Sequence, residues 1–280
     1  MTYATVLLHL DAHPRMDERT DYAARFARRF ESHLVGVAAA DRSLFGLSVA
    51  TGFAGTDKLS EAVEDCRAAA LLRARHFRER IEALELKSFE TVVDDSDEID
   101  TLLRRSTCSD LLIVAQPDPA WPDSGRARSQ FEQVVLHGVA PTLVLPHAGD
   151  FSAAGDRVMI AWDGSSGAAH AVVGALPLLQ RARKVHLVRC DTAVDIDRGE
   201  EPSELDSPRE WLGRHGVRID AHLQATGTDV GDALLSRASE FAANMLVMGA
   251  WGHSRLAERL LGGVTRTILS RMSVPVLMAH

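Results

Sequence analysis

Short apolar runs alternate with longer stretches of helical period along the chain. The first run, Tyr3 to Asp11 (YATVLLHLD), is typical of a buried strand, and apolar side chains then recur on one helical face from Ala23 to Phe30. Further strands are predicted at HLVGVAA, SFETVV, DLLIVAQ and APTLVLP, and the longest helix runs from about Lys58 to Leu84. Because strands and helices that alternate in this way form a parallel sheet covered on both faces, the pattern predicts an α/β fold.

The same order of elements starts again after the small-residue stretch HAGDFSAAGD, near Ala148. Strands are predicted at RVMIAWD, KVHLVRC, VRIDAHLQ, NMLVMGA and VPVLMAH, with helices between them. One constant shift, which lays Leu112 on Leu246 and Pro141 on Pro275, aligns the last two strands of both series without a gap. The sequence therefore predicts two tandem, doubly wound domains, residues 1–148 and 155–280, called the first half and the second half below.

Composition and charge narrow the classes of function. The chain has 280 residues and a formal net charge of -8, which argues against a nucleic-acid-binding surface, because such a surface needs an excess of basic side chains. No apolar run reaches the ~18–20 residues of a membrane span, and the start lacks a signal-peptide pattern, so we expect a cytoplasmic protein that binds no membrane. Three widely spaced cysteines and histidines without zinc-site spacing predict neither a disulfide nor a metal site.

Glycines gather in one stretch of the second half, GAWGHSRLAERLLGGVT. Gly249 and Gly252 follow a predicted strand, where ligands of open parallel sheets bind, and glycine lets a backbone approach a ligand closely. Gly262 and Gly263 precede a predicted helix, whose N-terminus offers unpaired N–H donors and a partial positive charge. The two glycine pairs are therefore predicted to converge on one polyphosphate.

This spacing, G-x2-G-x9-G, resembles the nucleotide-binding signature of the universal stress protein family, as do AWDGS after the first strand of this half and the closing VPVLMAH. The resemblance implies a five-stranded parallel sheet in each half, in the strand order 3-2-1-4-5. It also implies that the second half binds ATP or a related adenine nucleotide, with Mg2+ as an optional companion. The implied contact residues are Asp163, Val188, Gly249, Gly252, Gly262, Gly263, Val264 and Thr265.

The family resemblance also suggests roles for single residues. Asp163 would meet the adenine, and Thr265 would offer its hydroxyl to a phosphate or to a metal-bound water. The basic side chains nearby, His253, Arg255 and Arg266, are candidate partners of the phosphates. Each has a structural alternative, since Asp163 can simply start a helix and Thr265 can bond within one. No catalytic residue is assigned, and a stress-response module with little or no hydrolysis is expected.

Two departures keep other functions open. Gly263 stands where the family signature has Ser or Thr, so one hydroxyl contact to the γ-phosphate is missing. In the alignment of the two halves, the three signature glycines correspond to Ala115, Asp118 and Arg128 of the first half. A carboxylate in a phosphate-binding loop repels a polyphosphate, so the first half is interpreted as a degenerate copy. The alternatives are a scaffold for an unknown protein partner and a weak ATPase.

The last strands of the two halves, in APTLVLP and VPVLMAH, are apolar and would invite pairing if they lay at sheet edges. Members of the resembled family that have a single domain dimerise through this strand. We therefore expect the two strands to pair within one chain, as an intramolecular pseudo-dimer, with a further homodimer as an open alternative.

Overall fold

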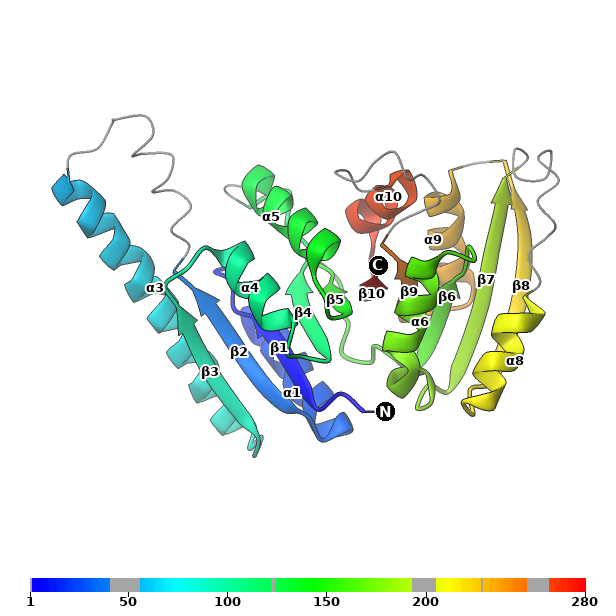
Figure 1. The fold of residues 1–280 in the computed structure, drawn as a ribbon, viewed down its shortest axis with the longest axis horizontal. Helices are drawn as coiled ribbons and strands as arrows, with labels where there is room; N and C mark the ends of the chain where they lie inside the picture. Colours follow the sequence, from blue (N-terminus) through cyan, green and yellow to red (C-terminus); the bar gives the residue numbers. More distant parts are fainter. Residues whose placement is uncertain (1, 41–55, 122–123, 193–204, 228, 251–261) are drawn as a thin grey trace. The chain divides into compact units, whose positions relative to one another are not determined.

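The computed structural model describes residues 2–40, 56–121, 124–192, 205–227, 229–250 and 262–280. Its contacts divide the chain into two compact units, Thr2–Ala140 and Pro141–His280. Figure 1 shows the strands and helices of both. Within the described ranges, no helix is both long enough and apolar enough to cross a lipid bilayer. The three cysteines, Cys66, Cys108 and Cys190, are all described and form no disulfide in the structure.

The unit Pro141–His280 contains a parallel sheet of five strands with helices on both faces (Figure 1). Its strand order is β8-β7-β6-β9-β10, which is the predicted order 3-2-1-4-5. The strands are β6 (Arg157–Ala161), β7 (Lys184–Thr192), β8 (Ile219–Thr226), β9 (Met245–Gly249) and β10 (Val276–Ala279). The helices are α6 (Ser166–Leu179), α8 (Asp206–Arg214), α9 (Val230–Glu240) and α10 (Gly263–Arg271). The predicted α/β class is thus confirmed.

The unit Thr2–Ala140 repeats this order as β3-β2-β1-β4, again with parallel pairing. Its strands are β1 (Thr5–His9), β2 (His33–Ala39), β3 (Phe89–Asp94) and β4 (Leu111–Ala115). Its helices are α1 (Met16–Phe30), α3 (Thr56–Ala83), α4 (Glu98–Ser106) and α5 (Ser124–His137), with α1 and α3 on one face and α4 and α5 on the other (Figure 1). The predicted start and end of the long helix lie within two residues of α3.

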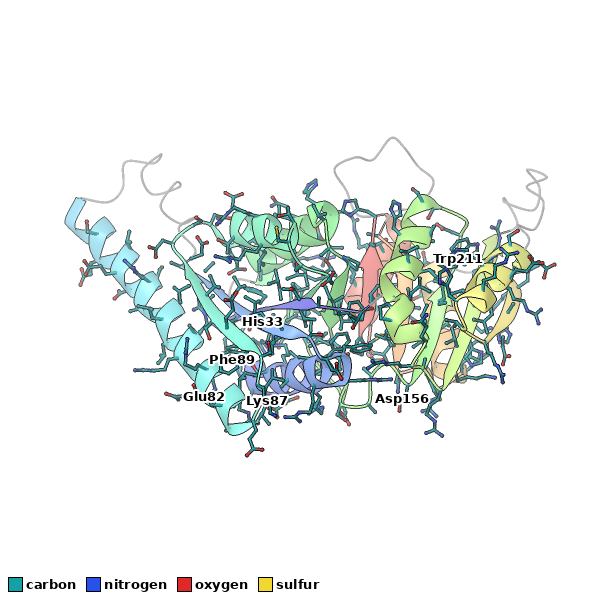
Figure 2. All side chains as sticks on the ribbon, turned by 60° about the horizontal axis from the view of Figure 1, so that its bottom comes forward. His33, Glu82, Lys87, Phe89, Asp156 and Trp211 are labelled. Atoms are coloured by element: carbon teal, nitrogen blue, oxygen red, sulfur yellow. The ribbon has the colours of Figure 1, made fainter. Side chains whose placement is uncertain are left out.

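A close contact fixes α3 on the sheet of the first unit. Phe77, from α3, is fully buried over Gly36 in the middle of β2, where a Cβ atom would lie 2.5 Å from the Phe77 ring. The same ring meets Phe89 of β3, labelled in Figure 2, edge-on at 6.4 Å. Glycine at position 36 therefore makes room for an aromatic side chain that covers two strands.

The fifth strand of the first half, β5 (Thr142–Leu145), belongs by its contacts to the unit Pro141–His280. It pairs with β10 in antiparallel orientation, with Val144 opposite Val276 and Leu143 opposite Leu277. The predicted pairing of the two last strands is therefore present. All four residues are fully buried, as expected of a strand pair inside a core.

Candidate functional site

A pocket of about 100 Å³ lies at the carboxyl ends of β6 and β9. The chain continues from β6 through β7 and β8 on one side and returns to β9 and β10 on the other, so the strand order reverses between β6 and β9. Ligands of open parallel sheets bind at such a reversal. The pocket is lined by Ala161, Trp162, Asp163, Val188, Cys190, Val230, Leu234, Met248, Gly249, Val264 and Thr265.

Five of the eight predicted contact residues meet in this pocket, namely Asp163, Val188, Gly249, Val264 and Thr265. Gly262 and Gly263 directly precede Val264 at the start of α10 and are absent from the lining. Gly252 falls outside the described residues, and so do His253 and Arg255. Arg266 is described and is exposed on the first turn of α10.

Asp163 is held by a turn between β6 and α6. Its Oδ1 atom accepts a hydrogen bond of 2.9 Å from the backbone N–H of Ser165, across Gly164, whose φ of +76° favours glycine. Ser165 is the residue that caps α6, because its hydroxyl oxygen accepts from the N–H of Ala168 at 3.1 Å. The alternative that Asp163 itself starts the helix is therefore wrong, and its half-buried carboxylate lines the pocket.

The opposite wall is apolar. Val188 of β7 is fully buried, and its carbonyl accepts from the N–H of Trp162 at 2.8 Å, which holds the loop after β6 against β7. Cys190 lies two residues further along the same strand, and Val230 and Leu234 lie one turn apart on α9. Sequence reasoning missed these last three residues, although the spacings i+2 on a strand and i+4 on a helix place them on shared faces.

Gly249 has a packing reason for lacking a side chain. A Cβ atom at this position would lie 2.7 Å from the backbone nitrogen of Ala168 and 2.9 Å from the carbonyl carbon of Gly167, both in the first turn of α6. Backbone atoms cannot move aside as a flexible side chain can. The close approach that this glycine permits in the structure is therefore between β9 and α6.

The start of α10 borders the pocket through Val264 and Thr265. Gly262 occupies the N-cap position without a side-chain hydrogen bond, and a Cβ atom at Gly263 would meet no described atom within 4 Å. The first N–H groups of a helix have no partner within it, so they are suited to an anion. Within the described part of the chain, Asp163 is the one pocket-lining residue with a formal charge at neutral pH.

The Thr265 hydroxyl has a partner in the protein. This residue is 2% exposed, and its Oγ1 atom donates a hydrogen bond of 2.9 Å to the carbonyl of Ala250, just after β9. The bond ties the first turn of α10 to the end of β9, which differs from both expectations for this residue. The hydroxyl proton is thus engaged, while the oxygen can still accept a hydrogen bond.

Comparison with known proteins agrees with this architecture. The model of the universal stress protein family matches residues 155–280. A universal stress protein from Archaeoglobus fulgidus DSM 4304 has a similar structure, with a TM-score of 0.75 and 18% identity over 98% of this chain and 94% of that one. A functionally unknown protein of Pseudomonas aeruginosa PAO1, PA1789, has a TM-score of 0.61 and 14% identity over 98% and 92%.

A sequence comparison with curated proteins gives no match. The identity to the two solved structures is low, so they show the shared fold over both halves. The family match covers the half that carries the pocket described above and the glycine spacing. Residues 155–280 therefore belong to the universal stress protein family, and the chain as a whole has the fold of these two solved structures.

Proposed function

We propose that the second half binds ATP or a related adenine nucleotide and acts as a regulatory module of a stress response, with little or no hydrolysis. The observation that carries this proposal is the pocket at the strand-order reversal. There Asp163 and the start of α10 lie on the same pocket as an apolar wall. Small-molecule sites typically combine a mostly apolar lining with a few polar groups in this way.

The apolar wall suits a flat aromatic base. Val188, Val230, Leu234 and Met248 supply it, and the Asp163 carboxylate can accept a hydrogen bond from an exocyclic amine. The pocket of about 100 Å³ is smaller than the ~300 Å³ typical of small-molecule sites, so it would hold the base rather than a whole nucleotide. The phosphates would extend toward the start of α10. Gly252 follows β9 by three residues in the sequence and is expected to lie near them.

The phosphates would depend on backbone donors. Gly263 supplies no hydroxyl, and the Thr265 hydroxyl donates to Ala250, so the N–H groups at the start of α10 are the donors that the described residues offer. Nothing in the described ranges groups three metal-ligating side chains, so Mg2+ would have to bind mainly through the phosphates, as it does in many nucleotide sites.

Little hydrolysis is expected from the same geometry. Phosphoryl transfer needs a positioned water and cations that stabilise the developing charge. Among the described residues that line the pocket, Asp163 is the one with a charged side chain, and one of its oxygens already accepts from Ser165. A scaffold that binds no nucleotide is the second candidate, favoured by Gly249, whose lack of a side chain is explained by packing alone.

Calorimetric titration of the full chain with ATP and adenosine tests the proposal. Gly263→Glu places a carboxylate at the helix N-terminus, where a Cβ atom meets no described residue; there it stabilises the helix but repels phosphate. We expect this variant to bind ATP at least about tenfold more weakly and adenosine unchanged, with Gly263→Gln as the uncharged control. Absence of ATP binding by the unchanged protein would favour the scaffold, and equal ATP affinity in all three proteins would contradict a phosphate site at the start of α10.

Two Asp163 variants separate the base contact from the turn. Asp163→Asn keeps an oxygen for the Ser165 N–H, whereas Asp163→Ala loses it. If the carboxylate binds the base, both variants should lower the affinity for adenosine, each by up to about tenfold, as expected for the loss of one hydrogen bond. We expect one nucleotide per chain, and a titration with two equivalent sites would contradict the assignment to the second half alone.

A further inference from the structure

Two histidines on neighbouring strands meet in the second half. His186 of β7 pairs in register with Asp220 of β8, and His222 follows two residues later on β8, so all three side chains project from the same face of the sheet. His186 Nδ1 lies 3.1 Å from His222 Nε2. The two histidines are 36 positions apart in the chain, so the pairing of β7 with β8 brings them together. Both lie outside the lining of the pocket where the strand order reverses.

An aromatic side chain holds the first of these rings. Phe241, the C-cap residue of α9, stacks on His186 with the ring centroids 4.1 Å apart and an angle of 8° between the planes. Phe241 also contacts the His222 ring, at 4.6 Å and 34°. His186 is 8% exposed, whereas His222 is half-buried on β8, the last strand in the sheet order. The pair thus has one ring fixed by packing and one ring that solvent can reach.

The spacing of the two nitrogens fits a shared metal ion. Imidazole nitrogens bind Zn2+ at about 2.0–2.1 Å. Angles between ligands of about 90° in tetragonal sites and about 109° in tetrahedral sites then place two such nitrogens about 2.9–3.3 Å apart. The observed 3.1 Å lies inside this range. The sheet therefore holds the two rings close enough for one ion to bind both, once the rings turn their lone pairs toward it.

The charged neighbours leave the two imidazoles as the available ligands. Asp220 forms an ion pair with Lys184 of β7. On α9, Arg237 lies over the Phe241 ring and pairs with Glu240 at 2.7 Å, so both carboxylates are engaged by cations. Within the described ranges, no third histidine, cysteine or acidic side chain completes a metal-ligating group. Imidazole suits Zn2+, Ni2+ and Cu2+, whereas Mg2+ and Ca2+ prefer oxygen ligands, so the pair favours the first class of ion.

We propose that His186 and His222 bind one divalent transition-metal ion, of the class of Zn2+, Ni2+ or Cu2+, with water molecules as the other ligands. The ion would join β7 to β8 in addition to their backbone hydrogen bonds. Because the unfolded chain does not hold the two rings side by side, an ion bound to both stabilises the folded state. The site needs no nucleotide, so it stands whether or not the pocket binds one.

Thermal melting of the full chain, stripped of metal ions and free of nucleotide, tests the proposal. The chain is melted alone and with Ni2+, Zn2+ or Mg2+ at equal concentration. Ni2+ and Zn2+ should raise the melting temperature, by roughly 5–11 °C at 100 times the dissociation constant, and should slow hydrogen exchange in β7 and β8. Mg2+ should do neither. No rise with Ni2+ and Zn2+, or an equal rise with Mg2+, would overturn the proposal.

Matched histidine variants then locate the ion. His222→Gln removes one ligand from a half-buried position, with less risk to folding than a change at the buried His186. This variant should bind Ni2+ at least about tenfold more weakly in calorimetry, because the ion loses one of two protein nitrogens. His33→Gln is the control in the first half (Figure 2): the His33 ring is hydrogen-bonded to Ser88 Oγ at 2.8 Å, and Ni2+ affinity should stay unchanged. Unchanged Ni2+ affinity in a folded His222→Gln protein would show that the two rings share a hydrogen bond alone, and would refute the site.

Discussion

Replacing Gly249 by alanine would test whether this glycine serves packing. The added methyl group would lie 2.7 Å and 2.9 Å from backbone atoms of Ala168 and Gly167, and 3.3 Å from the Ala168 Cα atom. Overpacking in a well-packed core costs about 1–3 kcal/mol, and the upper part of that range is expected because the clash is with backbone. At roughly 2–4 °C per kcal/mol, the melting temperature should fall by roughly 4–12 °C.

The measurement needs no ligand. Thermal melting by circular dichroism gives the shift, and hydrogen exchange shows whether β9 and the start of α6 lose protection while the first half keeps its own. Gly263→Ala is the matched control, because a Cβ atom there meets no atom of the described residues within 4 Å and should change stability little. A Gly249→Ala protein as stable as this control would show that the contact between β9 and α6 is not tight, and the packing explanation would fail.

Further predictions concern single side chains of the second half. Thr265→Val should destabilise by about 1–3 kcal/mol in urea unfolding, and Thr265→Ser much less, because the valine leaves the buried carbonyl of Ala250 without its donor. Gly263→Ser should tighten ATP more than ADP in calorimetry, and equal effects would show that a γ-phosphate hydroxyl contact is not what is missing. Burial, helped by His222, lowers the pKa of His186 below its ordinary 6.5, so the unfolded chain takes up a proton more readily there. Stability should therefore fall as pH falls below about 6.5, and less steeply in His186→Gln; parallel pH profiles would exclude His186 as the cause.

Most of the fold could be predicted because apolar periodicity reports burial. Strands such as Val158 to Ile160 are fully buried, and a parallel sheet covered on both faces leaves this continuous apolar signal. The contacts of β5 carry no such signal. The pairing of Thr142 to Leu145 with the last strand was expected, but its apolar residues do not indicate that most of its contacts lie within Pro141–His280.

The candidate site was predicted less completely than the fold. The glycine spacing predicted a site at the start of α10. A sequence does not show which atoms pack against a glycine, and at Gly249 these are backbone atoms of α6. The hydroxyl of Thr265 likewise bonds to Ala250, a partner set by tertiary packing. In the first half, His9 and Glu98 are distant in sequence and meet only because β1 and α4 border one pocket.

Because β5 pairs with β10 in antiparallel orientation, the edge of β10 should stay covered when the protein is diluted. A strand edge as apolar as β10 would require a second molecule to cover it, and the fraction covered would then depend on protein concentration. Here both strands belong to one polypeptide, so the effective concentration of the covering strand is fixed by the chain itself. A fragment of residues 155–280 lacks β5, and we expect it to self-associate in ultracentrifugation at concentrations where β10 of the whole chain stays covered.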